Sequence, residues 1–325
     1  MEPFQGNSEW GVGKVNFDFR TSIAGSIFPN PIFTASGCAG SGKELVHFFS
    51  LDNLGAIVTK SIMLKPRSGR ATPRMAETPS GMLNSIGLQG PGIELFLEND
   101  VPWLREQGAR IIVSIAGETV EDYAVLARKL RSVPGLSALE VNISCPNVEN
   151  RGQVFACNPD TARDAIAAVR RNIGGELPII AKLSPDVTDI AAIAESVVAA
   201  GADGLALINT LLGMVIDTNT MAPKLSQRTG GLSGPAIRPI AVRAIYQVRT
   251  ALPSVPIVGM GGVTNGRDAF ELVLAGANAV SIGTATFGDP MAAIIIRDEL
   301  EEICISKGFA SFSDVISYAH RAELQ

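Results

Sequence analysis

The chain has 325 residues, of which 46% are hydrophobic and 18% are charged, and its formal net charge at pH 7 is −5. This composition is typical of a folded globular protein and excludes a disordered chain, while the lack of a basic excess argues against a nucleic-acid-binding protein. The four Cys show no C-x-x-C spacing and only two His are present, so we expect neither a metal site nor a Cys-bound iron–sulfur cluster on this chain.

The chain has no segment that predicts insertion into a membrane. The N-terminal residues Met1–Arg20 contain no apolar run like that of a secretory signal, and the most apolar stretch, Ile190–Ile216, is interrupted by Glu195 and Asp203. We therefore expect no membrane span, and the sparse Cys favour the reducing cytoplasm.

Short apolar runs alternate with longer segments of helical period along the chain. The runs, which we predict to be buried parallel strands, are Pro31–Ser36, Ala56–Ser61, Arg110–Ile115, Ala138–Ile143, Pro178–Leu183, Gly204–Asn209, Pro256–Met260 and Ala277–Gly283. Helices are predicted at Glu121–Arg131, Pro159–Arg171, Asp189–Ala200, Gly234–Ala251, Gly266–Ala275 and Pro290–Lys307. This alternation without a linker predicts one α/β domain over residues 1–325, folded as a (β/α)8 TIM barrel. A doubly wound open sheet competes, but Ser36–Gly42 does not match its G-x-G-x-x-G turn.

Additions to the basic barrel are predicted at its N-terminus and in its connections. The alternating segments Val15–Arg20 and Ser22–Phe28 are expected to form an N-terminal hairpin, within residues 14–30, that closes the barrel floor. Residues 1–13 are an extension to which we assign no role. The connections Ile62–Asn99, Ser144–Asn158 and Thr210–Ser233 are too long for simple turns. All three follow the carboxyl ends of strands, where barrel active sites assemble.

Polar side chains end four otherwise apolar strands. They are Lys60, Asn142, Lys182 and Asn209. On a barrel all four would point toward one mouth, and a buried Lys must be paired or must face an anionic ligand. Two cations and two amides around one cavity suit a planar, anionic ligand that forms hydrogen bonds.

Glycines follow the last two predicted strands, in Pro256–Val263 and in Val280–Ala285. Barrel enzymes bind phosphate there with backbone N–H groups and a helix N-terminus, although tight turns alone also require glycine. Flavin mononucleotide (FMN) has both a phosphate tail and a ring that needs cationic support, so it fits the glycines and the lysines together.

Cys145 lies in Asn142–Asn147, just beyond the fourth predicted strand. Nearby lysines lower the pKa of a thiol, which favours a general base or a nucleophile at this position. For Cys38, Cys157 and Cys304 we instead expect small buried side chains.

Several segments carry motifs that are highly specific in combination. They are Thr59–Ser61, Pro73–Gln89, Asn142–Asn147, Ala181–Pro185, Ile208–Thr210, Gly230–Ala236, Gly259–Gly262 and Gly283–Thr284. Over nearly its whole length the sequence therefore resembles the catalytic subunits of class 1B, NAD-linked dihydroorotate dehydrogenases. One departure is Gly90, where family members often have Asn, and we interpret it as a turn substitution.

The resemblance implies oxidation of dihydroorotate to orotate in pyrimidine (UMP) biosynthesis, with one FMN per chain. Cys145 matches the family's base, which takes the proton from C5 while hydride passes from C6 to the flavin. The implied substrate-binding residues are Lys60, Asn84, Ser85, Ile86, Gly87, Leu88, Asn142, Asn147, Asn209 and Thr210. The implied flavin-binding residues are Ala35, Ser36, Gly37, Lys60, Ser61, Asn142, Lys182, Ile208, Gly234, Gly261, Gly262, Gly283 and Thr284.

The resemblance also implies a partner for electron transfer. Class 1B enzymes reduce NAD through a second subunit that carries FAD and a 2Fe–2S cluster. This chain has neither a C-x4-C-x2-C pattern nor a dinucleotide fingerprint, so both groups would belong to the partner. The implied assembly is a catalytic homodimer flanked by two such subunits, a heterotetramer.

Alternatives remain open at this point. A fumarate-linked class 1A enzyme has the same base and flavin site, and a dihydropyrimidine dehydrogenase-like reductase has the same N-x-S-C-P motif. A non-redox isomerase or aldolase would use Lys60 or Lys182 as a Schiff-base lysine. A purely structural role is least favoured, because polar groups at four strand ends are costly without a ligand.

Overall fold

The computed structural model describes residues 17–143, 158–175 and 177–321, and within them eight parallel strands form one sheet in the order β3-β16-β15-β10-β9-β8-β7-β4. The strands are β3 (Ile32–Thr34), β4 (Ile57–Val58), β7 (Ile111–Ile115), β8 (Leu136–Asn142), β9 (Ile179–Lys182), β10 (Gly204–Leu207), β15 (Ile257–Met260) and β16 (Ala279–Ile282). The Gly55 N–H donates to the Ile32 carbonyl at 2.8 Å and the Thr34 N–H to Ala56 at 3.2 Å, which joins the two ends of the sheet. The predicted barrel is confirmed, and an open doubly wound sheet is excluded.

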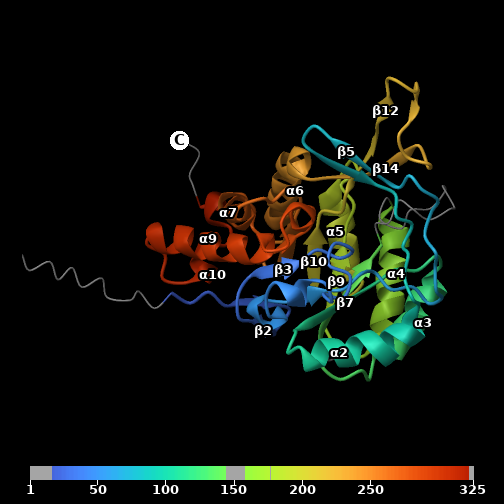
Figure 1. Cartoon of the computed structure of the whole chain (residues 1–325). Helices are drawn as coiled ribbons and strands as arrows, with labels where there is room; N and C mark the ends of the chain where they lie inside the picture. The colour runs from blue at the N-terminus through green and yellow to red at the C-terminus, as the bar shows by residue number, and fades with distance from the viewer. Residues whose placement is uncertain (1–16, 144–157, 176, 322–325) are drawn as a thin grey trace, which may run out of the picture.

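Helices lie around the outside of this barrel (Figure 1). They are α1 (Ile93–Leu95), η3 (Phe96–Asp100), α2 (Val101–Glu106), α3 (Val120–Leu130), α4 (Pro159–Ile173), α5 (Ile190–Ala199), α6 (Arg238–Ala251), α7 (Gly266–Ala275), α8 (Ala285–Gly288), α9 (Ala292–Ser306) and α10 (Phe312–Val315). Short 3-10 helices are η1 (Leu45–His47), η2 (Leu51–Asn53), η5 (Pro235–Ile237) and η6 (Tyr318–His320). The predicted helices match α3 to α7 and α9 with small shifts at their ends. Asn158 caps the N-terminus of α4, since its side chain accepts a hydrogen bond from the Asp160 N–H at 2.8 Å.

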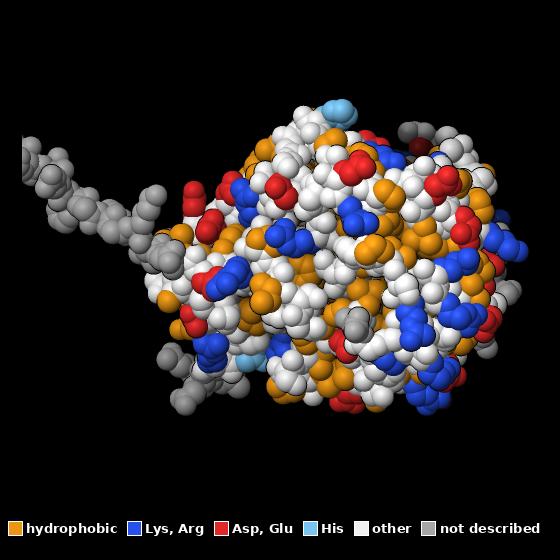
Figure 2. Space-filling model, turned by 90° about the horizontal axis from the view of Figure 1, so that it is seen from below, with side chains coloured by type: hydrophobic (Ala, Val, Ile, Leu, Met, Phe, Trp, Pro, Cys, Tyr) orange, Lys and Arg blue, Asp and Glu red, His pale blue; other side chains and the backbone are white. Residues whose placement is uncertain are grey.

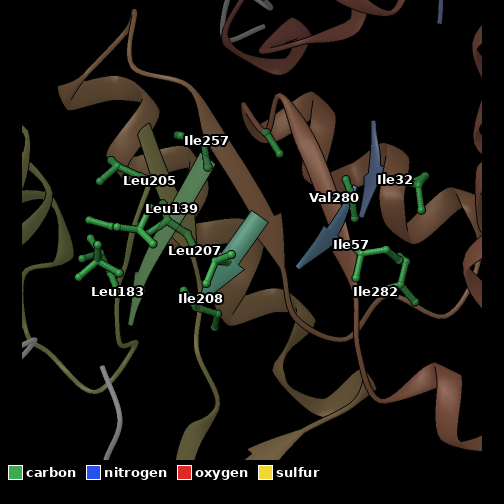
Figure 3. Close-up of a cluster of buried hydrophobic side chains, with 14 of the residues drawn as sticks. Ile32, Ile57, Leu139, Leu183, Leu205, Leu207, Ile208, Ile257, Val280 and Ile282 are labelled. Atoms are coloured by element: carbon green, nitrogen blue, oxygen red, sulfur yellow. The ribbon is translucent and has the colours of Figure 1, made fainter. Parts of the chain in front are cut away.

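Each barrel strand alternates between two hydrophobic layers. Side chains such as Ile32, Ile57, Leu139, Leu205 and Val280 belong to the large cluster between the strands and the helices (Figure 3). Their neighbours in sequence fill the barrel interior, and these are Phe33, Val58, Ala138, Ala206 and Ala279. Every second side chain along a strand faces the same way. The residue two positions after each of these interior side chains therefore also faces inward, nearer the carboxyl end of the barrel.

A hairpin closes the amino-terminal end of the barrel, but not with the predicted strands. It consists of β1 (Thr21–Ile23) and β2 (Ser26–Phe28), and its turn is Ala24–Gly25, both with positive φ. The predicted first strand, Val15–Arg20, was therefore wrong in its described part, where Asp18 forms only an isolated bridge with Ser311. Ile23 and Phe28 of the hairpin pack into the interior cluster. Residues 1–13 lie outside the described residues.

Two of the long predicted connections contain strands that pair with each other. Four described strands form an antiparallel sheet in the order β11-β14-β6-β5, which we call the roof sheet. Its strands are β5 (Met75–Thr78), β6 (Gly81–Asn84), β11 (Leu211–Met214) and β14 (Thr229–Ser233). Beyond it, β12 (Ile216–Asp217) pairs with β13 (Ala222–Pro223) in a protruding hairpin, at the top of Figure 1. The roof sheet joins the connections that follow β4 and β10.

The surface carries charges of both signs. On the face shown in Figure 2, Lys and Arg side chains are interspersed with Asp and Glu, and hydrophobic side chains lie between them. Among the helices of the described residues, none is both long and apolar enough to cross a lipid bilayer.

Candidate active site

A cavity of about 850 Å³ opens at the carboxyl ends of the barrel strands, beside the roof sheet. Nearly all described residues that the sequence predicted for substrate or flavin contribute to its wall. They are Ala35, Ser36, Gly37, Lys60, Ser61, Asn84, Ile86, Gly87, Leu88, Asn142, Lys182, Ile208, Asn209, Thr210, Gly234, Gly261, Gly262, Gly283 and Thr284. The barrel thus brings together residues from seven predicted strands or their following loops, as expected for an active site of this fold.

Among the described residues predicted for the site, Ser85 does not contribute to this wall. Ser85 is fully buried outside it, and its hydroxyl accepts a hydrogen bond from Arg70 Nη1 at 3.2 Å. The Ser85 hydroxyl is thus engaged outside the wall, and the assignment of Ser85 to the substrate site stays a prediction. Cys145 and Asn147 lie outside the described residues.

A chain of hydrogen bonds runs inward from the cavity. Asn209 Nδ2 donates to Asn142 Oδ1 at 3.4 Å, and Asn142 Nδ2 donates to Ser61 Oγ at 3.0 Å. Ser61 Oγ lies 2.9 Å from Ser114 Oγ, which donates to Glu140 Oε1 at 2.8 Å. The two amides at the cavity wall are therefore held by a buried polar network rather than by solvent.

Lys182 comes from β9 and is almost fully buried. Its ammonium donates to Ser36 Oγ at 2.9 Å and lies 3.9 Å from Glu140 Oε1. A second cation, Lys60, lies so close to Gly37 that a Cβ at position 37 would be 3.1 Å from Lys60 Nζ. Gly37 also has φ +90°, which favours glycine. The two lysines give the floor of the cavity a positive charge.

The glycines at the end of β15 and β16 bring loops close together. At Gly262, with φ +76°, a Cβ would lie 2.8 Å from the Arg238 nitrogen and 2.9 Å from the Gly234 carbonyl oxygen. The neighbouring loop is fixed by Asp268, which accepts hydrogen bonds from Thr264 N at 2.9 Å and Thr264 Oγ1 at 2.7 Å and pairs with Arg238. The absence of a side chain at Gly262 therefore lets its loop pack against Gly234 and Arg238, so that backbone forms this part of the cavity wall.

Two cysteines differ from each other in their surroundings. Cys304 is fully buried as expected, and burial raises its pKa to about 12. Cys38 as a residue is partly exposed and also lines the cavity, which the expectation of a small buried side chain did not include. Burial raises the pKa of the Cys38 thiol, and the charges of Lys182 and Lys60 offset this only in part. Cys38 is therefore a neutral thiol and a poor base near pH 7. Cys157 lies outside the described residues.

Further residues, which the sequence motifs did not indicate, also line the wall. They are Cys38, Arg67, Met75, Met82, Gln89, Gly90, Pro91, Ser233, Pro235, Ile237, Met260, Val263, Thr264, Ser281, Ala285, Phe287 and Gly288. Ser281 lies two residues before Gly283 on β16, so strand periodicity already placed it on the same inward face. Glu140, two residues before Asn142, was missed in the same way.

The residues of the wall fit FMN. The cavity lies within the range of roughly 300–1,000 Å³ that is usual for small-molecule sites. Among the described buried side chains, Ser281 Oγ has no hydrogen-bond partner, and it faces this cavity. Two lysines lie at one part of the wall and glycine backbone at another, which matches a ring at the first and a phosphate at the second. Within the described residues, His, Cys, Asp and Glu do not gather in a group that would hold a metal ion.

The fold and the site define a (β/α)8-barrel enzyme with a cation-lined cavity at its carboxyl-terminal face. The family model for dihydroorotate dehydrogenase matches residues 19–304. The "Dihydroorotate dehydrogenase B (NAD(+)), catalytic subunit" of Desulforudis audaxviator is 48% identical over 92% of this chain and 97% of its own length. Proteins of the same name from Geobacter sp. (strain M21) and Bacillus cytotoxicus are each 46% identical, over 92% and 91% of this chain and 97% and 94% of their own lengths. The chain belongs to the dihydroorotate dehydrogenase family, a family of oxidoreductases.

Proposed function

We propose that this chain is the FMN-dependent catalytic subunit of a class 1B dihydroorotate dehydrogenase and oxidises dihydroorotate to orotate in pyrimidine biosynthesis. The observation that carries the proposal is the meeting of Lys60, Lys182, Asn142 and Asn209 at one cavity that glycine backbone closes at its other end. The names of the similar proteins support the same activity and favour NAD over fumarate as the final acceptor.

The residues divide the work between the two reacting positions. Cys145 takes the proton from C5 of dihydroorotate, and bound FMN supplies the two-electron acceptor for C6, which leaves the C5=C6 double bond of orotate. Asn142 and Asn209 are held by the polar network in position to bind the amide edges of the substrate ring, with Asn84, Asn147 and Thr210. Lys60 would contact both the substrate and the flavin, and Lys182 would stabilise the negative charge of the reduced flavin ring.

The remaining wall residues hold the cofactor. Of the residues that line the cavity, Ala35, Ser36, Gly37 and Ser61 would hold the flavin ring, and Gly234, Gly261, Gly262, Gly283 and Thr284 would hold its ribityl and phosphate end. Electrons leave through a partner subunit with FAD and a 2Fe–2S cluster, in a cytoplasmic heterotetramer built on a catalytic homodimer. The words "catalytic subunit" in the relatives' names support such a partner.

The activity is tested with the purified protein and dihydroorotate. We expect a yellow protein whose flavin absorbance near 450 nm bleaches on anaerobic addition of dihydroorotate alone, and whose co-purified iron–sulfur flavoprotein then reduces NAD. Bleaching by dihydrouracil but not by dihydroorotate would contradict the substrate, and direct turnover with fumarate would contradict the NAD linkage. A colourless preparation that acts on a carbonyl substrate, and whose adduct with that substrate is trapped by borohydride, would support a Schiff-base enzyme instead.

The loop between β15 and α7 provides a test of the phosphate site. Asp268 holds Thr264 and pairs with Arg238, whose backbone nitrogen adjoins Gly262. We expect Asp268→Asn to weaken FMN binding about tenfold, or about 1.4 kcal/mol, because the loop loses a charged anchor. Riboflavin has no phosphate, so its affinity is expected to stay unchanged.

The measurement is fluorescence titration of the apoprotein with each flavin. Asp298→Asn, at an exposed position on α9, is the matched control and is expected to bind both flavins as the unchanged protein does. Equal losses of FMN and riboflavin affinity in Asp268→Asn would show that the loop does not act on the phosphate.

A further inference from the structure

Glu140 is a buried acid beneath the cavity that the proposed reaction does not use. It lies on β8 between Leu139 and Val141, which face the helices, and so its own side chain faces the barrel interior. Its exposure is 2%. Among the described residues that line the cavity, Lys60, Arg67 and Lys182 are cations and none is an acid. The carboxylate of Glu140 therefore sits behind a positively charged wall.

The first contact of Glu140 is with Lys182, one of the cations of that wall. Glu140 Oε1 lies 3.9 Å from Lys182 Nζ, and both side chains are almost completely buried. Charges interact strongly at such positions because solvent does not screen them. Lys182 also donates to Ser36 Oγ at 2.9 Å, on the side of the proposed flavin site. The carboxylate of Glu140 thus partly offsets the positive charge that Lys182 presents to the proposed flavin site.

The second contact of Glu140 sets the direction of the hydrogen-bond chain. A carboxylate only accepts, so the Ser114 hydroxyl must donate to it. Ser114 Oγ can then only accept from Ser61, and Ser61 Oγ in turn accepts from Asn142 Nδ2. This order fixes the Asn142 amide with its oxygen toward Asn209 Nδ2. Every hydrogen in the chain points toward Glu140.

We propose that Glu140 is a positioning residue that orients the Asn142–Asn209 amides through Ser114 and Ser61 and balances the charge that Lys182 presents to the flavin. The inference rests on the proposed function, since it assigns Glu140 to the same flavin and substrate site. The two roles of Glu140 can be tested separately. The orientation of the amides requires Ser114 as an intermediate, whereas the balance of the Lys182 charge depends on Glu140 alone.

The charge role is tested with Glu140→Gln, which keeps the size of the side chain and removes its charge. In the FMN-loaded protein we expect the ratio of reduced to oxidised flavin at a given potential to rise about tenfold, which is about 30 mV for two electrons. Dye-equilibrated spectra measure this shift. Glu302→Gln removes the same charge from the exposed part of α9 and is expected to leave the midpoint potential unchanged.

The orientation role is tested with Ser114→Ala, which breaks the chain and keeps the Glu140 charge. We expect the KM for dihydroorotate to rise at least fivefold with an unchanged flavin potential. In Glu140→Gln the KM also rises, because the Gln amide can donate to Ser114 and release the order of the chain. Glu140→Asp retains the charge and is expected to bring the potential back toward that of the unchanged protein.

The outcomes separate this inference from the proposed function. An unchanged or lowered potential in Glu140→Gln with FMN still bound would overturn the charge role, and an unchanged KM in Ser114→Ala would overturn the orientation role. If Glu140→Gln does not fold, Glu140→Ala decides the charge role by the potential, and Ser114→Ala decides the orientation role by the KM. Failure of the unchanged protein to bind FMN or to be reduced by dihydroorotate would instead contradict the proposed function.

Discussion

Replacing Cys145 with Ala is expected to lower the turnover of dihydroorotate by about 10² to 10⁴, the usual contribution of a positioned general base. FMN should remain bound at full occupancy, because the flavin wall is built from other residues. Flavin reduction by dihydroorotate in a stopped-flow instrument measures the step directly, before any partner subunit is involved.

The pH dependence of the flavin reduction rate identifies the base as a thiol or as another group. A thiol has an ordinary pKa near 8.5, so the reduction rate of the unchanged protein should rise with pH until the thiolate is fully formed. In Cys145→Ser the hydroxyl is a far weaker acid, and the rise should move to higher pH with a lower rate at neutrality.

Cys38, which lines the cavity, supplies a matched control. Its thiol is neutral because burial raises its pKa, so Cys38→Ala should retain turnover within a fewfold. A large loss of turnover in Cys38→Ala together with normal turnover in Cys145→Ala would show that the base is Cys38 and not Cys145.

Replacing Gly262 with Ala is expected to weaken FMN binding by more than about a hundredfold, or about 2.7 kcal/mol. The added Cβ would lie within 2.9 Å of two backbone atoms, and the left-handed φ of +76° costs a non-glycine residue about a further 1–2 kcal/mol. The β15 loop and the start of α6 would have to separate, and the surface proposed for the phosphate would open.

Gly288→Ala is the control for this effect. Gly288 also lines the cavity, but a Cβ there would meet no atom within 4 Å. Its FMN affinity should stay within twofold of the unchanged protein, as measured by flavin fluorescence. Equal affinities in the two variants would show that the phosphate lies away from the β15 loop.

The barrel could be predicted because its strands are local and apolar on both faces. Runs such as those of β7 and β9 need no alternation, so length and Val/Ile content identify them, and the polar residues at their ends follow from the run itself. The same strands show why Glu140 and Ser281 were missed. Each has an apolar residue on both sides in its strand, and only the period of two, counted back from Asn142 or Gly283, places Ser281 in the cavity and Glu140 under it.

The other errors arose where distant segments or turn chemistry decide the structure. The strands of the roof sheet are short, three of them contain glycine and the fourth, β5, lies half-exposed, so their sequences show no clear apolar alternation. They exist because β6 pairs with β14, which no local pattern predicts. The N-terminal hairpin turns at Ala24–Gly25 because two positive φ values are needed in succession, and the glycine marked that turn.

The pairing of β6 with β14 also bears on how the protein folds. Their partners Asn84 and Gly231 are 147 residues apart in the chain, whereas Ile112 and Ala138 of the adjacent strands β7 and β8 are separated by only 26. At about 0.6 kcal/mol for each doubling of loop length, closing the longer loop costs about 1.5 kcal/mol more entropy. We therefore expect the roof sheet to assemble after the barrel strands, and its amides to exchange with solvent deuterium before those of the barrel strands.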